Sequence, residues 1–132
     1  MRLALLLPAF ALLFTPALRS ADSARTVSVV RDAAPGRAAQ HGIDRLEAAL
    51  RAQGWIVEPA ASLESPRDRH VILAGTSPGS GAAANALRAA GVAIPTAAEA
   101  LAVRKFTVRG QPTLVLCGAD DRGLMYAALD AA

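Results

Sequence analysis

Aromatic residues and cysteine are scarce in this chain of 132 residues. Phe, Trp and Tyr make up 4% of it, and the single cysteine, Cys117, has no partner for an internal disulfide. The net charge is only +3, and no basic cluster with interleaved aromatic residues marks a nucleic-acid-binding surface. Hydrophobic residues reach 53%, but 32 alanines supply much of that share, so composition does not indicate a membrane bundle. The length suits one small domain.

Familiar metal-binding and cofactor-binding motifs are also missing. His41 and His70 belong to no His-Glu-x-x-His arrangement and lack a third ligand, so we predict no metal site. The stretch 79–84 matches Gly-x-Gly-x-x-Ala, but it begins four residues after Gly75 rather than at a strand end. No lysine follows in the position that a phosphate-binding loop requires. We interpret this stretch as a tight turn and predict no cofactor.

The first segment has the pattern of a secretory signal peptide. Arg2 precedes an apolar run from Leu3 to Phe14, and small residues follow around Ala17 and Ala21. The run is short for a permanent membrane span and is interrupted by proline. We therefore predict a signal peptide at 1–23, a secreted or periplasmic protein, and no stable membrane span after cleavage. The alternative is an uncleaved anchor or a buried N-terminal helix.

The remaining chain, 24–132, alternates strand patterns with helix patterns. Ile43, Leu46 and Leu50 fall on one face of a helix, Glu47 and Arg51 can pair on its exposed side, and a glycine closes it. The predicted elements up to the middle of the chain are a strand at 26–31, a helix at 38–53, strands at 55–58 and 70–74, and a helix at 82–90.

Two strand patterns near the C-terminus, 101–108 and 112–117, flank a predicted hairpin turn at 109–111. The apolar alternation slips within the first of them, and a bulge near Arg104 and Lys105 would reconcile it. Thr96 and Glu99 have the spacing of a capping box, so a short helix could precede or replace the start of that strand. Asp120 begins a last helix. The order βαββα-ββα predicts an α/β (α+β) sandwich with a mixed sheet and about three helices.

Two adjacent carboxylates, Asp120 and Asp121, allow two interpretations. One of them could act as a general acid beside the charge of the other, but their place before a helix favours capping. Arg122 suits a surface ion pair. Trp55 and Tyr126 could stack on a sugar ring, although aromatic residues in a small domain more often belong to the core.

The stretch from Pro112 to Asp130 combines a strand, the motif Gly-x-Asp-x-Arg-Gly-x-x-Tyr and a helix. This order resembles the N-terminal accessory domains of α-glucuronidases and of β-hexosaminidase-type glycoside hydrolases. An apolar strand that ends in Gly75-Thr76, and Glu99 before the hairpin, resemble two further features of these domains. The resemblance covers Thr26 to Ala132. The motif residues are Gly118, Asp120, Arg122, Gly123 and Tyr126.

The resemblance implies a zincin-like α/β domain that is not itself catalytic and that packs against a (β/α)8 barrel carrying the catalytic carboxylates. The motif residues would then be structural and docking residues, with no catalytic, cofactor or metal ligand among them. Because the sequence stops at Ala132, we expect the last helix to be cut short, with the barrel in cis if the reading frame continues. The expected function is that of an accessory domain of a secreted glycoside hydrolase. The alternative is a stand-alone exported module that binds a carbohydrate or a protein.

Overall fold

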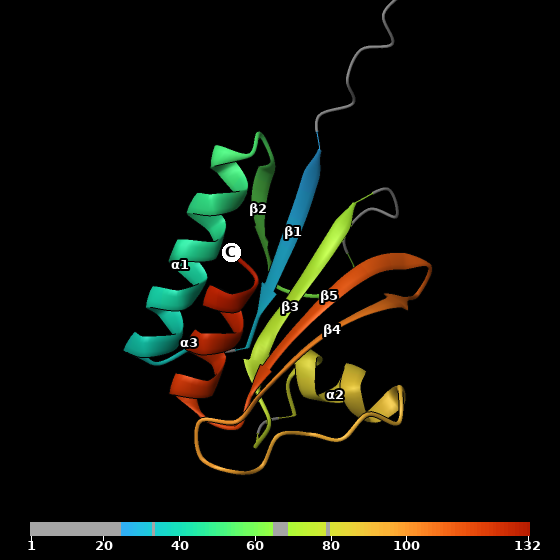
Figure 1. Cartoon of the computed structure of the whole chain (residues 1–132). Coiled ribbons are helices and arrows are strands. Elements are labelled where there is room, and N and C mark those ends of the chain that lie inside the picture. Colours follow the sequence, from blue (N-terminus) through green and yellow to red (C-terminus); the bar gives the residue numbers. More distant parts are fainter. Residues whose placement is uncertain (1–24, 33, 65–68, 79) are drawn as a thin grey trace, which may run out of the picture.

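The chain forms a five-stranded mixed sheet flanked by three helices (Figure 1). The computed structural model describes residues 25–32, 34–64, 69–78 and 80–132, so the predicted signal peptide at 1–23 lies outside the described residues. The predicted α/β class and element order are confirmed. The elements are β1 (Thr26–Arg31), α1 (Arg37–Ala52), β2 (Ile56–Ala60), β3 (His70–Thr76), α2 (Ala82–Ala89), β4 (Leu101–Val108), β5 (Gln111–Gly118) and α3 (Asp121–Asp130).

The strands lie in the order β2-β1-β3-β5-β4. The first four are parallel, and β4 joins the edge antiparallel to β5. Parallel strands need crossover connections, and here α1 and α3 cover one face while α2 covers the other (Figure 1). All three helices therefore begin at the edge of the sheet where β1, β3 and β5 end.

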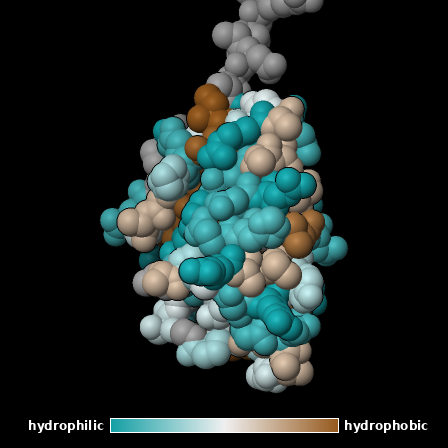
Figure 2. All heavy atoms as spheres, turned by 90° about the vertical axis from the view of Figure 1, so that its left-hand side faces the viewer, coloured by the Kyte–Doolittle hydropathy of each residue, from teal (hydrophilic) through white to brown (hydrophobic). Residues whose placement is uncertain are grey.

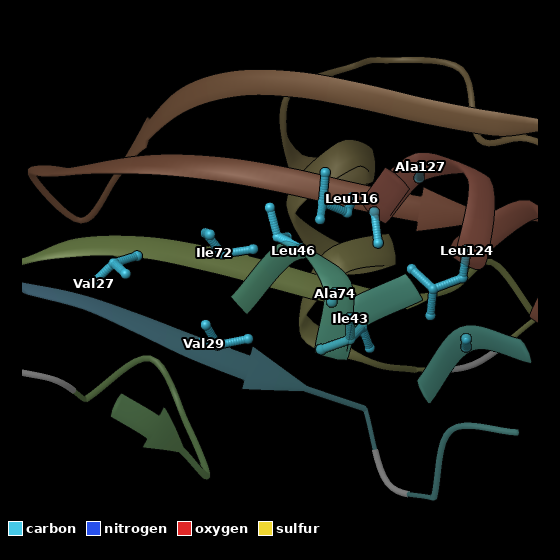
Figure 3. Close-up of a cluster of buried hydrophobic side chains, with 11 residues drawn as sticks. Val27, Val29, Ile43, Leu46, Ile72, Ala74, Leu116, Leu124 and Ala127 are labelled. Carbon is cyan, nitrogen blue, oxygen red and sulfur yellow. The ribbon is translucent and has the colours of Figure 1, made fainter. Parts of the chain in front are cut away.

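A hydrophobic layer lies on each face of the sheet. Residues that alternate along β1, β3 and β5 pack against α1 and α3 (Figure 3). The residues between them face α2, so the central strands are apolar on both sides, as predicted for 70–74. Many helix residues in these layers are alanines, which bring helix and sheet close together but bury little area each. The first layer contains Val27, Val29, Ala39, Ile43, Leu46, Ile72, Ala74, Leu116, Leu124, Ala127 and Ala128.

Helix α1 matches its predicted pattern in the buried residues Ile43 and Leu46, and Gly54 follows its end with a left-handed φ of 84°. One expectation about this helix is wrong. Glu47 pairs with Arg51 at 2.9 Å but is buried, because Arg31 of β1 binds its other carboxylate oxygen from the sheet side. The spacing in the sequence predicted Arg51, the partner of Glu47 on the helix, but not Arg31, its partner on the strand.

Two local expectations near β4 are also corrected. The pairing of β4 with β5 runs without interruption from Leu101 to Val108, so there is no bulge at Arg104. Val103 packs against the layer of α1 and α3 and Phe106 against the layer of α2, so an uninterrupted edge strand accommodates the slip in alternation. The segment before β4 is not helical either, since Glu99 has a left-handed φ of 59°.

The β4–β5 hairpin closes through a two-residue turn. Arg109 and Gly110 have φ values of 51° and 80°, and Val108 pairs with Gln111 across the turn. Two successive positive φ values match the twist of the flanking strands, which is why short hairpins use them. The predicted hairpin is confirmed, and its turn is one residue shorter than 109–111.

A candidate docking motif at the start of α3

Four of the five motif residues meet where β5 turns into α3. Asp120 caps the helix, because one carboxylate oxygen accepts a hydrogen bond from the Gly123 amide at 2.8 Å. The other oxygen accepts from the Glu99 amide, also at 2.8 Å. These hydrogen bonds favour the carboxylate and lower the pKa of Asp120, the Gly123 bond being the larger cause. The side chain thus caps α3 and ties the 97–100 segment to it.

The backbone of the 97–100 segment has further contacts to this junction. The Ala119 amide donates to the Ala100 carbonyl at 2.8 Å. Arg122 forms an ion pair with Glu99 at 3.0 Å, and this hydrogen bond raises the pKa of the guanidinium. Positive φ is strained for a glutamate, so the contacts of Asp120 and Arg122 hold an unfavourable backbone in place.

Both motif glycines stand where a side chain has no space. A Cβ at Gly118 would overlap the backbone nitrogen of Leu124, and a Cβ at Gly123 would overlap the carbonyl oxygen of Ala100. Neither glycine has a positive φ, so their role is close backbone approach rather than an unusual conformation.

The fifth motif residue, Tyr126, lies apart from these contacts. Its side chain is 41% exposed, and Leu129 and Leu101 are exposed to a similar degree. Tyr126 and Leu129 are three residues apart on the outer face of α3, and Leu101 begins the neighbouring strand β4. We call Leu101, Tyr126 and Leu129 the α3 patch. The α1 and α3 side of the molecule is otherwise largely hydrophilic, with separated hydrophobic side chains (Figure 2).

Two carboxylates cap helices that begin elsewhere in the chain, which the sequence pattern did not predict. Asp121 accepts a hydrogen bond from the Ala38 amide in the first turn of α1 at 3.0 Å. Asp32, at the end of β1, accepts from the Thr76 amide at 3.1 Å and from the Ala82 amide at the start of α2. Burial raises the pKa of Asp32, and these two amides oppose the rise.

A glycine at the N-cap of a helix is the sequence signal that could have indicated these caps. Both α1 and α2 have a glycine N-cap, Gly36 and Gly81, with no side chain to satisfy the first amides. A Cβ at Gly36 would overlap the carboxylate of Asp121, and one at Gly81 would overlap that of Asp32. A glycine N-cap thus leaves room for a carboxylate from elsewhere in the chain.

The three capping aspartates line one cleft of about 490 Å³ at this edge of the sheet. Helix N-termini commonly bind phosphate through free amides, but here carboxylates occupy amides at all three. Their negative charge disfavours an anion in the cleft. Gly79 of the glycine-rich stretch lies outside the described residues, and Gly81 serves as the N-cap of α2.

The other residues singled out from the sequence do not converge on a reaction centre. His41 and His70 are exposed, on α1 and at the start of β3. Burial, with the charge of Asp32, raises the pKa of Cys117 to about 11, so its thiol stays protonated at neutral pH. Across the described ranges, no three His, Cys, Asp or Glu side chains gather as metal ligands. Trp55 contacts the ring of His70 edge to face, with 5.2 Å between centroids.

Within the described residues, none of the helices has the length and apolar character to cross a membrane. No protein-family model matches the sequence, and no curated protein matches it. Nine chains of solved structures do match, among them the one titled "Structure of CpGH84D", a protein of glycoside hydrolase family 84. That match has a TM-score of 0.61 at 13% sequence identity, and it covers 78% of this chain and 16% of the other. The likeness shows a shared fold, and this chain spans a small part of the length of that neighbour.

Proposed function

We propose that residues 24–132 form a non-catalytic accessory domain of a secreted glycoside hydrolase, which packs against a catalytic (β/α)8 barrel. The observation that carries the proposal is the combination of this fold with the geometry of the motif at the start of α3. The fold is shared with a glycoside hydrolase much longer than this chain. The motif, whose order resembles glycoside hydrolase accessory domains, joins the 97–100 segment to the start of α3.

The chemistry of the motif supports a structural role. The carboxylate of Asp120 accepts hydrogen bonds from two backbone amides, and Arg122 pairs with Glu99. A general acid in a glycosidase needs a raised pKa, whereas hydrogen bonding lowers the pKa of Asp120. The motif therefore suits the positioning of the 97–100 segment and of α3 better than proton transfer.

The α3 patch is the surface that we assign to the barrel contact. Leu101, Tyr126 and Leu129 are among the large hydrophobic side chains that remain exposed, and the motif fixes the element that carries two of them. Exposed apolar and aromatic side chains with neighbouring charges, here Arg122 and Glu99, are typical of protein interfaces.

The first test is to sequence the gene and its transcript past codon 132. We expect the frame to continue for several hundred codons, with alternating strand and helix patterns and a pair of acidic residues at predicted barrel strand ends. A stop codon directly after codon 132 would contradict packing in cis.

Export is tested separately by mass spectrometry of the protein from the culture medium or periplasm. We expect the mature chain to begin close to residue 24. Retention of the first 23 residues in the cell fraction would contradict the signal peptide.

The rival function is a stand-alone exported binding module, which the exposed ring of Tyr126 permits. Titration of the isolated chain with oligosaccharides distinguishes the two. Saturable binding that Tyr126→Ala abolishes supports the module, and absence of binding supports the packing role.

A further inference from the structure

The outer strand of the sheet, β4, uses only half of its main-chain groups for pairing with β5. In an antiparallel pair, residues alternate between those that bond to the partner strand and those that point away from it. The two-residue turn makes Val108 and Gln111 a hydrogen-bonded pair. The bond from the Ala119 amide to the Ala100 carbonyl fits the same alternation. The even-numbered residues of β4 therefore bond to β5, and the odd-numbered residues point outward.

Val103, Lys105 and Thr107 thus direct their amides and carbonyls away from the sheet. β4 is the last strand in the order, and no strand of the described chain pairs with this side of it. The guanidinium of Arg104 donates to the Val103 carbonyl at 2.9 Å, where an added strand would place an amide. Between residues 101 and 108, neither a proline nor a bulge interrupts the strand. The edge is therefore continuous and able to pair with a further strand.

Three cations lie along this edge, namely Arg104, Lys105 and Arg109. All three are exposed, and they take part in none of the ion pairs found among the described residues. The sequence from 100 to 119 contains no Asp or Glu. Arg109 has a φ of 51° in the turn, where Asn or Gly would be less strained, so the fold tolerates a conformational cost at this cation.

The cations determine which kind of strand suits the edge. Lysine and arginine on an edge strand commonly hinder its pairing with a second copy. An antiparallel second copy centred on this edge would bring Arg104 or Lys105 close to its counterpart, and like charges opposite each other are destabilising. A strand with carboxylates at the opposite positions would instead form cross-strand ion pairs. Charge complementarity therefore favours an acidic partner.

A hollow beside the edge adds an apolar subsite. Phe106 and Val108 line it from β4, and Ala86, Ala89 and Ala90 line it from the end of α2. Its volume is about 340 Å³. Helix α2 packs against β3 and β5 (Figure 1), so this face of β4 is open toward the outer edge. Side chains of an added strand alternate between the two faces of the sheet, and every second one on the α2 face would point toward the hollow.

We propose that the outer edge of β4 accepts an extended segment of a partner protein. The main chain of that segment pairs with Val103, Lys105 and Thr107, its carboxylates lie opposite Arg104 and Lys105, and an apolar side chain fills the hollow. Strand addition of this kind obtains affinity from main-chain hydrogen bonds and specificity from pockets for alternate side chains. The inference goes beyond the proposed packing role, because residues 103–109 and the α3 patch have no member in common.

The probe is the peptide Glu-Val-Thr-Val-Glu-Glu-Thr with both ends blocked. In the antiparallel orientation its middle valine lies opposite Phe106, and its two adjacent glutamates lie opposite Lys105 and Arg104. We expect saturable binding to the purified chain, followed by hydrogen exchange of single amides. The amides of Val103, Lys105 and Thr107 should exchange more slowly with the peptide, whereas those of Arg104 and Phe106 are already bound to β5 and should not change.

Two methylated peptides test the main-chain pairing without any change to the protein. A methyl group on the backbone nitrogen of the glutamate opposite Lys105 removes a hydrogen bond to β4, whereas the same change opposite Arg104 affects an amide that points away. We expect the first peptide to bind at least about tenfold more weakly than the unmodified one, and the second to bind within about threefold of it.

Matched protein variants test the charges. Arg104→Gln and Lys105→Gln each remove one cation of the edge, and Arg45→Gln removes an exposed cation from α1. Exposed ion pairs are weak, so we expect each edge variant to weaken binding of the peptide by about twofold to fivefold. Arg45→Gln should leave binding unchanged.

The proposal is overturned if the peptide does not slow the exchange of the outward amides, or if the two methylated peptides bind equally well. An equal effect of the Arg45 and Lys105 variants would contradict it too, since overall charge would then explain the binding. Slower exchange of the outward amides at high protein concentration without peptide would show that a second copy occupies the edge instead. None of these outcomes bears on the gene-sequence test of the accessory-domain proposal, so the two can fail separately.

Discussion

At the scale of single residues, Asp120 connects the start of α3 to Glu99, which lies 21 residues earlier in the chain. Its carboxylate accepts from Gly123 on α3 and from Glu99 before β4. Replacement of Asp120 by alanine leaves both amides without this partner and releases the strained Glu99 backbone. We expect Asp120→Ala to lower the melting temperature by about 5 °C, as loss of a helix cap commonly does in a domain of this size.

The matched control is Asp130→Ala, at the other end of the same helix. Asp130 is exposed and lies where the helix dipole disfavours a negative charge, so its removal should leave the melting temperature unchanged or slightly higher. Thermal unfolding followed by circular dichroism measures both variants. If both variants lowered the melting temperature equally, the capping hydrogen bonds of Asp120 would not contribute measurably to stability.

The pH dependence of stability should also report the capping hydrogen bonds of Asp120. The folded-state pKa of Asp120 is lowered, so its contribution is present above the unfolded pKa of about 3.9 and is lost as the pH falls through the folded value. Asp32 has a raised pKa and acts in the opposite direction. Urea unfolding between pH 6 and pH 2 should therefore show a smaller loss at low pH for Asp120→Asn than for the wild type.

Glycine positions separate two physical causes of destabilisation. Gly123→Ala forces a methyl group against the carbonyl of Ala100, and we expect it to lower the free energy of unfolding by about 1–3 kcal/mol. Gly91→Ala has open space but a φ of 66°, and should cost no more than about 1 kcal/mol. Urea denaturation measures both, and a Gly123 variant as stable as the Gly91 variant would contradict the close contact.

At the scale of elements, the starts of α1 and α2 depend on aspartates from elsewhere in the fold. Asp121 reaches α1 from the first turn of α3, and Asp32 reaches α2 from the end of β1. The first turn of each helix is thus completed only when the sheet and the neighbouring elements are in place, in contrast to α3, which has its own cap.

Hydrogen exchange tests this dependence. We expect Asp121→Ala to reduce the protection of the amides at the start of α1, at Ala38 above all, and to leave the Gly123 amide of α3 protected by Asp120. Asp121→Asn keeps an acceptor oxygen and serves as the control. Protection lost equally along α1 and α3 would indicate general unfolding instead.

The elements themselves were largely predictable from sequence, because periodicity reports burial. The apolar spacing of Ile43 and Leu46 and the continuous run at 71–74 identified α1 and β3 correctly. The failures lie where long-range contacts decide. A short helix at Glu99 was one alternative, but the Glu99 amide donates to Asp120 instead. Glu47 was expected on the exposed side of α1, but it is buried and also pairs with Arg31 of β1.

At the scale of the whole molecule, the arrangement of the candidate site also depends on long-range contacts that the sequence does not reveal. The motif residues were found from sequence order, and their shared junction was not visible until β5 and the 97–100 segment were placed side by side. Tyr126 of the α3 patch belongs to the motif and was therefore named from the sequence, whereas Leu101 joins the patch only because the fold places β4 beside α3.

The proposed docking surface yields a prediction about the parent protein. Tyr126→Ala and Leu129→Ser remove exposed side chains, so we expect the melting temperature of the isolated domain to change by less than about 2 °C. In the presence of the barrel domain, the double variant should weaken association by at least about tenfold. Ile56→Ser, on the exposed edge strand β2, is the control. Calorimetry measures the association, and an unaffected double variant would place the interface elsewhere.

The two-residue turn between β4 and β5 also bears on how the chain reaches its native state. That hairpin is the strand pair of shortest sequence separation in the described sheet, whereas the parallel pairs join segments separated by a helix or a long loop. Closing a short turn costs little chain entropy, and closing a crossover costs more. We therefore expect the β4–β5 hairpin, at the edge of the sheet, to form before the centre of the sheet. The strand β3 would then pair with β5, and β1 would pair with β3.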